Sequence, residues 1–449
     1  MFSRILKSKL TALTAAIVSS ISMVPDGLAS VVSELEMQRI NYEKAQDILD
    51  KKDLKAYQAI RPSITAYPLT PYVDYRAFLV GLDKKSPTEV RAFIAENKAF
   101  PFSNRISAPY LSALSKNKDW EGVLEYQIQE PVGEKYQCIY YRAHYEREQH
   151  EIAFNGAKQL WLSGNGVDDQ CDPLFNYWDK AGLRTDELIL ERMLLAFENR
   201  NGKLMSYLTK QLDSEESIAQ AKAMKAIYRK PEGVLTFAKK YPANDFYRSQ
   251  TEFAFEKLAR KSSTEAQSVF NDVMKAQKFP EKKQQELADY VSFRLINTDS
   301  DALAVWRDDV ISTTSRQTLL ERRARLAIQH ADWSGLVKWV SKLDESHQAS
   351  LRWQYWLGRA EVETGKVTQG KQRLMAITGQ RNFYSVAAAK EIKQSINYST
   401  STLKLEREKV APYKETLVRI SELIDVDKIA AAKSEWRWLL SNVTKEEKA

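Results

Sequence analysis

The sequence contains few of the residues that interrupt regular structure. Its 449 residues include only 15 glycines and 13 prolines, both well below average usage. No sustained alternation of β-branched and polar residues marks a strand. Because alanine, leucine, glutamate, lysine and glutamine are abundant, the composition favours helix throughout. A chain of this length is too long for one ordinary core, so we expect two or three domains or one long repeat array.

Motifs for catalysis and for ligand binding are also missing. The sequence has no glycine-rich phosphate loop, no His-Glu-x-x-His and no Gly-x-Ser-x-Gly. Its four histidines are scattered, so we expect neither a metal site nor a cofactor. Paired acids such as Glu361 and Glu363 fit solvated helix faces or caps. Nothing singles out a carboxyl group in an apolar cleft, as a glycan-cleaving acid requires, and we expect no catalytic residue.

The net charge by itself excludes few kinds of binding partner. The formal net charge is +8, with basic and acidic residues interspersed and no concentrated basic arm. This balance suits an anionic polymer or, at most, peripheral contact with a membrane surface. We expect no nucleic-acid partner, because no basic platform with interleaved aromatic residues is present.

The only long apolar run lies at the N-terminus. Arg4, Lys7 and Lys9 precede an apolar run over 10–24, and small residues follow at Gly27 and Ala29. This pattern predicts a secretory signal peptide over residues 1–29, cut between Ala29 and Ser30. The alternative is a retained membrane anchor, which the run of about 15 residues is too short to form as a spanning helix.

Cysteine is nearly absent. In an oxidising compartment, the two cysteines, Cys138 and Cys171, are expected to pair. The loop that this bridge would close is worth roughly 3 to 4 kcal/mol in the chain-entropy model. The alternative, two free thiols, needs a reducing cytosol, which the signal peptide argues against.

What the sequence does contain is helical periodicity, shown most clearly over residues 321–393. Apolar residues recur at spacings of three and four, with Trp353 and Trp356 among them, and Gly365 and Gly379 stand where helices end. Short helices with short turns cannot each bury a core alone, so neighbours must stack. This pattern predicts an α-solenoid of helical pairs.

Several local signals place helix boundaries. Ser86-Pro87-Thr88-Glu89 is a helix start with a capping box. Pro68 and Pro71 predict an extended corner, with the next helix beginning at Val73. Polar residues 397–402 predict a linker.

Two segments more than 200 residues apart resemble each other. Asp119-Trp120-Glu121-Gly122 and Asp332-Trp333-Ser334-Gly335 share Asp-Trp-x-Gly, followed in each by apolar residues. Asp can cap the helix that Trp begins. The match is either chance or the trace of an internal repeat.

Taken in order, these segments resemble the soluble lytic murein transglycosylases over nearly the whole mature chain. The resemblance rests on the segments around the two cysteines, on Lys118-Asp119-Trp120, and on motifs toward both chain ends. The segments are 67–69, 71–72, 118–120, 138–145, 157–164, 171–175, 178, 181–183, 355–356, 359–360, 381–388 and 435–436.

The resemblance implies a fold and a compartment. The fold is an all-α, right-handed α-superhelix, a U-shaped solenoid of short helical pairs over residues 30–396. A small helical linker domain over residues 397–449, which we expect to be incomplete, closes it into a ring. The resemblance also implies a disulfide between Cys138 and Cys171, and the periplasm of a Gram-negative bacterium.

It further implies cleavage of the β-1,4 bond between N-acetylmuramic acid and N-acetylglucosamine without water, which leaves 1,6-anhydromuramoyl ends. In the family, a lysozyme-like domain carries this reaction through a glutamate in a Glu-Ser dipeptide, with Gly-Leu-Met-Gln downstream. Here Glu216-Ser217 and Glu345-Ser346 lie inside the solenoid, and no Gly-Leu-Met-Gln follows either. No catalytic residue is therefore carried over.

Two functions follow as expectations. In the first, the chain is the scaffold portion of a lytic transglycosylase, truncated or divergent, which binds peptidoglycan glycan strands and is inactive alone. In the second, it is a non-enzymatic periplasmic adaptor that holds peptidoglycan or enzymes of cell-wall synthesis or lysis.

Overall fold

The computed structural model describes residues 26–398 and 410–444, with side chains from residue 34 onward. Within these ranges the regular elements are all helices, which confirms the predicted all-α class. Contacts divide the chain into two compact units. Unit 1 comprises residues 1–153 and 403–449, and unit 2 comprises residues 154–402. The chain thus leaves unit 1 once and returns to it.

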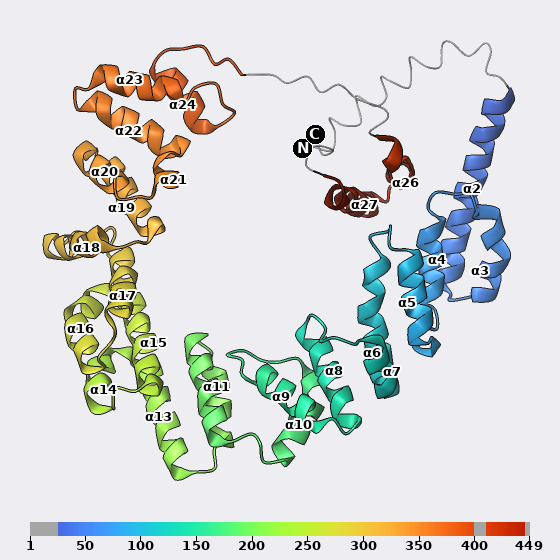
Figure 1. Ribbon diagram of the computed structural model, residues 1–449, viewed down its shortest axis with the longest axis horizontal. Coiled ribbons are helices and arrows are strands. Elements are labelled where there is room, and N and C mark those ends of the chain that lie inside the picture. Colours follow the sequence, from blue (N-terminus) through green and yellow to red (C-terminus); the bar gives the residue numbers. More distant parts are fainter. Residues whose placement is uncertain (1–25, 399–409, 445–449) are drawn as a thin grey trace. The chain divides into compact units, whose positions relative to one another are not determined.

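Unit 1 is built from helices at both ends of the sequence (Figure 1). Its helices are α2 (Asp26–Asp50), α3 (Leu54–Ile60), α4 (Thr70–Leu79), α5 (Pro87–Glu96), α6 (Ser107–Asn117), α7 (Trp120–Tyr126), α8 (Glu134–Glu146), α26 (Lys414–Asp425) and α27 (Ile429–Asn442).

Unit 2 is a continuous run of the sequence, and in Figure 1 its helices from α19 onward follow one another as neighbours. Its helices are α9 (His150–Trp161, which begins just before the boundary), α10 (Asp172–Lys180), α11 (Asp186–Glu198), α12 (Gly202–Leu208), α13 (Glu215–Arg229), α14 (Val234–Lys240), α15 (Asp245–Lys261), α16 (Ser263–Ala276), α17 (Glu281–Arg294), α18 (Asp301–Thr313), α19 (Gln317–Gln329), α20 (Trp333–Val340), α21 (Glu345–Gln348), α22 (Leu351–Glu363), α23 (Val367–Ala376) and α24 (Phe383–Glu391).

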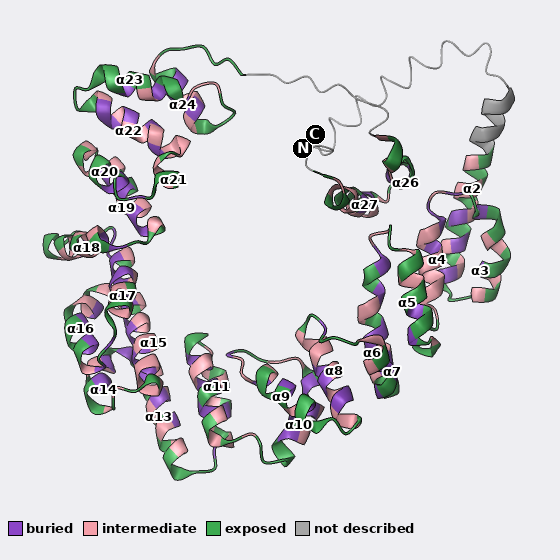
Figure 2. Cartoon of the chain, in the orientation of Figure 1, coloured by how far each residue is buried: buried purple, intermediate pink, exposed green. Residues whose placement is uncertain are grey.

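Most of the buried apolar clusters are local in sequence. One cluster draws on residues 82–143, another on residues 296–360 around Trp339 and Trp353, and a third on residues 355–388. Most of the helices carry both buried and exposed residues (Figure 2). This is the pattern that the helical periodicity predicts, because each short helix completes its core with its sequence neighbours.

A recurring turn joins many of these helices. One residue adopts the left-handed conformation, and the next donates its N–H to a carbonyl five residues back, as in a Schellman motif. After Lys118 and Ala331 the next residue is Asp119 or Asp332, whose carboxylate accepts the N–H of Gly122 at 2.9 Å or of Gly335 at 2.8 Å. Both Asp residues therefore cap helices as predicted.

The same turn also occurs where the Asp-Trp-x-Gly sequence does not. Lys52 and Arg200 are left-handed, and Asp53 and Asn201 after them cap α3 and α12. A shared turn geometry, which selects Asp or Asn at the cap, therefore accounts for the Asp that the two distant segments share.

The helix starts show one correct prediction and one error. Ser86 and Glu89 form the predicted capping box. The expected corner at Pro71 is wrong, because α4 begins at Thr70 and takes Pro71 into its first turn. Proline is favoured there because the first helical N–H groups have no intrahelical acceptor.

Two glycines let α22 and α23 approach closely. A Cβ at Gly370 would lie 2.5 Å from the carbonyl oxygen of Gly358 and 2.7 Å from a methyl carbon of Val362. A Cβ at Gly358 would meet Leu374 at 2.9 Å. Backbone cannot yield as a flexible side chain does, so this crossing requires glycine.

We predict that Gly370→Ala destabilises the protein by about 1–3 kcal/mol, the usual cost of overpacking. This cost opposes a gain of about 1 kcal/mol from the helix propensity of alanine. Urea unfolding measures the difference. Gly166→Ala is the control, since a Cβ at Gly166 meets nothing within 4 Å. Unchanged or increased stability of Gly370→Ala would show that the helices can separate at no cost.

Candidate functional site

The two Glu-Ser dipeptides lie in helix starts. Glu216 is exposed in the first turn of α13, and the N–H of Ser217 is bonded to the Ser214 hydroxyl at 3.1 Å. Glu345 is exposed in the short helix α21. A general acid in glycan cleavage needs burial to raise its pKa, so neither position provides that environment.

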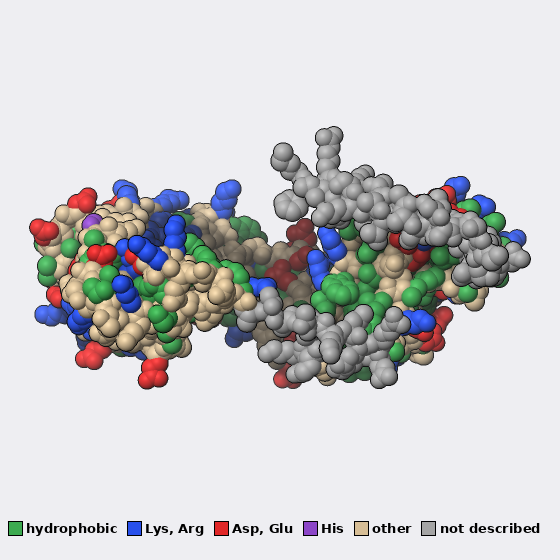
Figure 3. Space-filling model, turned by 90° about the horizontal axis from the view of Figure 1, so that it is seen from above, with side chains coloured by type: hydrophobic (Ala, Val, Ile, Leu, Met, Phe, Trp, Pro, Cys, Tyr) green, Lys and Arg blue, Asp and Glu red, His purple; other side chains and the backbone are tan. Residues whose placement is uncertain are grey.

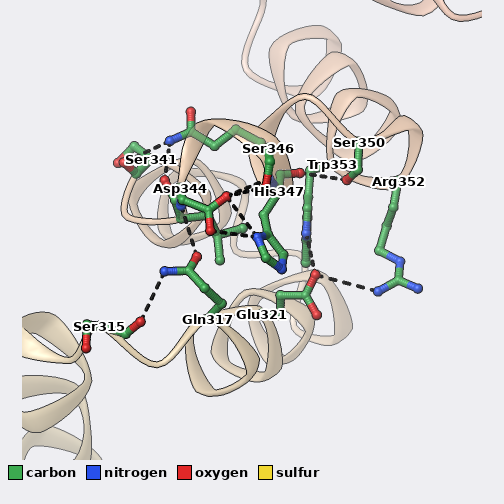
Figure 4. Close-up of polar contacts among 12 residues, drawn as sticks. Ser315, Gln317, Glu321, Ser341, Asp344, Ser346, His347, Ser350, Arg352 and Trp353 are labelled. Atoms are coloured by element: carbon green, nitrogen blue, oxygen red, sulfur yellow. Dashed lines mark hydrogen bonds and ion pairs between the residues drawn. The ribbon is translucent and has the colours of Figure 1, made fainter.

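The second dipeptide belongs to a capping network (Figure 4). The Asp344 carboxylate accepts hydrogen bonds from the backbone N–H of His347, the His347 ring and the Ser346 hydroxyl, each at 2.8 Å. The bond from the His347 N–H, the largest cause, and those from the side chains lower the pKa of Asp344 to about 2. The hydroxyl of Ser346 thus serves the cap.

Polar side chains also hold α19 against this turn and against α22. The Gln317 amide oxygen accepts the N–H of Asp344 at 2.9 Å. The Glu321 carboxylate accepts the indole N–H of Trp353 at 2.9 Å and lies 3.7 Å from Arg352 (Figure 4). These contacts brace neighbouring helices and present no reactive group.

A different kind of site lies in unit 1, where the two ends of the chain meet. Apolar residues of α26 and α27, namely Ile420, Leu423 and Ala432, share one buried cluster with residues 42–73. We call this contact the terminal junction. This cluster joins segments more than 300 residues apart, whereas the three clusters named above are local in sequence.

The first polar centre of the terminal junction is Glu422, which is 5% exposed. Arg39 donates to both of its oxygens, at 2.6 and 2.8 Å, and the Tyr67 hydroxyl donates at 2.6 Å. The bond from Arg39 lowers the pKa of Glu422 against the opposing effect of burial. Burial, together with the bond to Glu422, raises the pKa of Tyr67.

The second centre is Glu435, which is fully buried. Arg419 donates to its two oxygens at 3.1 and 3.2 Å, and the Tyr72 hydroxyl donates at 2.8 Å. The Arg419 guanidinium also lies over the Phe100 ring, 4.5 Å from its centroid. Each buried carboxylate is therefore held by one arginine and one tyrosine.

Further hydrogen bonds fix the register at the rim. The Trp438 indole donates to the carbonyl of Ala99 at 3.0 Å, and Arg105 donates to the Ser434 hydroxyl at 3.0 Å. Lys428 donates to the Gln46 side chain at 2.8 Å. The carboxylate oxygens of Glu422 and Glu435 are all bonded to arginine or tyrosine. We therefore interpret the terminal junction as a clamp between the two ends of the chain and not as an acid–base site.

Sequence reasoning did not find the terminal junction. It singled out Tyr67, Tyr72 and Glu435 only as parts of separate segments that resemble a family. Hydrophobic periodicity reports which residues are buried, but it does not report which distant segment buries them.

The residues that the sequence did single out are placed as follows. Cys138 and Cys171 are both disulfide-bonded, and the chain has no third cysteine. Residues 1–25 of the predicted signal peptide lie outside the described residues. The predicted cleavage point between Ala29 and Ser30 falls early in α2.

Among the described residues, no three side chains of His, Cys, Asp or Glu are grouped to hold a metal ion. In the same part of the chain, no helix is both long and apolar enough to cross a bilayer.

Comparison with known proteins gives a consistent set of similarities. Residues 411–449 match the family model described as the soluble lytic murein transglycosylase L domain. The chain is 30% identical over 416 residues, 92% of its length, to soluble lytic murein transglycosylases of Salmonella typhimurium and Escherichia coli. It spans 64% of the length of these relatives.

Comparison with solved structures also finds lytic transglycosylases. The chain is similar to the 70 kDa soluble lytic transglycosylase of Escherichia coli, with a TM-score of 0.77 and 30% identity, over 92% of this chain and 67% of that one. A complex of the 70 kDa enzyme with bulgecin A matches equally well. A lytic transglycosylase of Pseudomonas aeruginosa, 21% identical with a TM-score of 0.75, shares the fold.

We predict that acid loosens the terminal junction through Glu422. Its pKa is lowered in the folded state, so its contribution to stability is complete above about pH 4.5, near the unfolded value. That contribution is lost as the pH falls toward the folded pKa. After correction for the intrinsic pH dependence of amide exchange, the protection of residues 410–444 should therefore fall below about pH 4.5.

Glu422→Gln should show faster exchange of residues 410–444 already at pH 7 and a weaker acid response. The substitution removes the charge that pairs with Arg39, which costs about 1–3 kcal/mol. Asp425→Asn is the matched control, because Asp425 is more exposed and contacts the same arginine at 3.2 Å. Equal effects of both variants would contradict a special role for Glu422.

Proposed function

The chain belongs to the soluble lytic murein transglycosylase family, and we propose that it forms the peptidoglycan-directed scaffold of such an enzyme. The observation that carries the proposal is the extent of the similarity, which covers 92% of this chain but 64% of its curated relatives. The described part of this chain is a helical framework in which both Glu-Ser dipeptides lie at exposed helix starts and the buried Glu422 and Glu435 are held in the terminal junction.

The domain boundaries belong to this proposal. We assign residues 1–29 to a signal peptide, 30–396 to the superhelical domain and 397–449 to the linker domain. The match of residues 411–449 to the L-domain family supports the last assignment. The terminal junction gives the linker domain a role, since it holds the C-terminal segment on the first helices of the superhelix.

Export to the periplasm follows from the same reasoning. The disulfide of Cys138 and Cys171 is stable in an oxidising compartment, and peptidoglycan lies in that compartment. Glycan strands are the proposed partner, and enzymes of cell-wall synthesis or lysis are further ones.

We predict that the purified chain sediments with isolated sacculi but does not cut them. The family reaction is non-hydrolytic cleavage between N-acetylmuramic acid and N-acetylglucosamine, so cleavage would raise the amount of 1,6-anhydromuropeptides. Chromatography and mass spectrometry of digested sacculi should show no increase over buffer. Sedimentation at low and high salt tests whether binding depends on simple charge attraction.

An increase in 1,6-anhydromuramoyl ends would overturn the proposal that this chain does not cleave glycan strands. In that case a double variant, Glu216→Gln with Glu345→Gln, identifies the source. Loss of cleavage in the double variant would assign it to a Glu-Ser dipeptide. Absence of sacculus binding at every salt concentration would overturn the scaffold role itself.

A further inference from the structure

Two adjoining cavities in unit 2 are lined by cations. The larger, of about 450 Å³, lies beside Arg260, Lys261, Arg294 and Arg322. The smaller, of about 260 Å³, lies beside Arg322 and Arg325. Because Arg322 lines both, the two form one surface, which we call the basic groove. No aspartate or glutamate lines either cavity.

The groove gathers charge of one sign although charges elsewhere are mixed. Figure 3 shows basic and acidic side chains interspersed on the face that it views. Among the described residues, Arg260 pairs with Glu256 at 3.4 Å and Lys261 pairs with Glu232. The other three arginines of the groove have no carboxylate within ion-pair distance in the described part of the chain.

Aromatic residues of α17 hold the guanidinium groups in place. Arg260 and Arg294 both donate to the Tyr290 hydroxyl oxygen, each at 2.7 Å. Arg294 also lies over the Tyr290 ring at 4.4 Å, and Arg322 lies over the Phe293 ring at 4.1 Å. The stacking contacts use the face of the guanidinium, so the N–H groups of Arg322, and those of Arg294 that do not bond to Tyr290, remain suited to an oxyanion.

Helix ends account for part of this arrangement. Arg260, Lys261 and Arg294 stand in the last turns of α15 and α17, where cations offset the helix dipole. That effect acts on each helix separately. Like charges repel, so the helix dipole does not explain why Arg260 and Arg294 share the Tyr290 hydroxyl oxygen. It also does not explain why Arg322 and Arg325 add further positive charge to the same surface.

We propose that the basic groove binds an extended ligand carrying at least two oxyanions, carboxylates or phosphates, spaced to reach both cavities. Arginine recognises either group through paired N–H bonds. The proposal does not depend on the role in peptidoglycan binding.

Isothermal titration of the full chain with two probes, a hexaglutamate peptide and tripolyphosphate, tests it. Arg322→Gln with Arg325→Gln should weaken binding of the active probe by at least about tenfold, because charge-assisted bonds are lost. The matched control is Lys433→Gln with Arg437→Gln, two exposed cations on α27 in unit 1. It removes the same charge and should change binding less than about twofold, as expected for screened charges.

The probes separate the sources of the oxyanion. Binding of the peptide alone identifies a carboxylate ligand, and binding of tripolyphosphate alone identifies a phosphate ligand. Arg325→Gln by itself guards against misfolding, since Arg325 is exposed, and it should weaken binding in the same direction. No binding of either probe, or equal loss in the groove and control variants, would overturn the proposal.

Discussion

The burial of two carboxyl groups, each paired with an arginine, is the constraint that joins the two ends of the chain in unit 1. Taking a carboxylate out of water costs several kcal/mol unless its oxygens find partners. Glu422 finds Arg39 and Tyr67, and Glu435 finds Arg419 and Tyr72. A shift of α26 or α27 by one residue would leave a buried charge unpaired. The polar groups therefore select one register, while the apolar cluster around Leu423 supplies the burial.

This constraint differs in kind from those that build the helical pairs. Each pair closes a short loop, and many are joined by the same left-handed turn, so their contacts form with little loss of chain entropy. The terminal junction must bring together residues such as Tyr67 and Glu422, separated by 355 positions. The entropic cost of closing a loop grows only slowly with its length, by about 0.6 kcal/mol per doubling. A few buried contacts therefore suffice to hold the terminal junction together.

The same physical reasoning separates structure from chemistry in this chain. Glu216 and Glu345, the acids of the two Glu-Ser dipeptides, are exposed in the first turns of their helices. The buried Glu422 and Glu435 of the terminal junction are each held by one arginine and one tyrosine and join the two ends of the chain. Among the described residues, Arg294, Arg322 and Arg325 have no carboxylate within ion-pair distance, and all three line the basic groove.

The sequence by itself determined the helices and most of their boundaries, because periodicity, caps and turn residues act within a few positions. It predicted the caps at Asp119, Asp332 and Ser86, and failed at Pro71 because proline fits a first turn as well as a corner. The resemblance to the family added the expectation that the linker domain closes the superhelix, but it did not predict which residues make the contact. Only the tertiary structure decided that Glu422 meets Arg39 and that Arg260 and Arg294 meet at Tyr290. Such pairings depend on the summed geometry of many helices, which no local pattern contains.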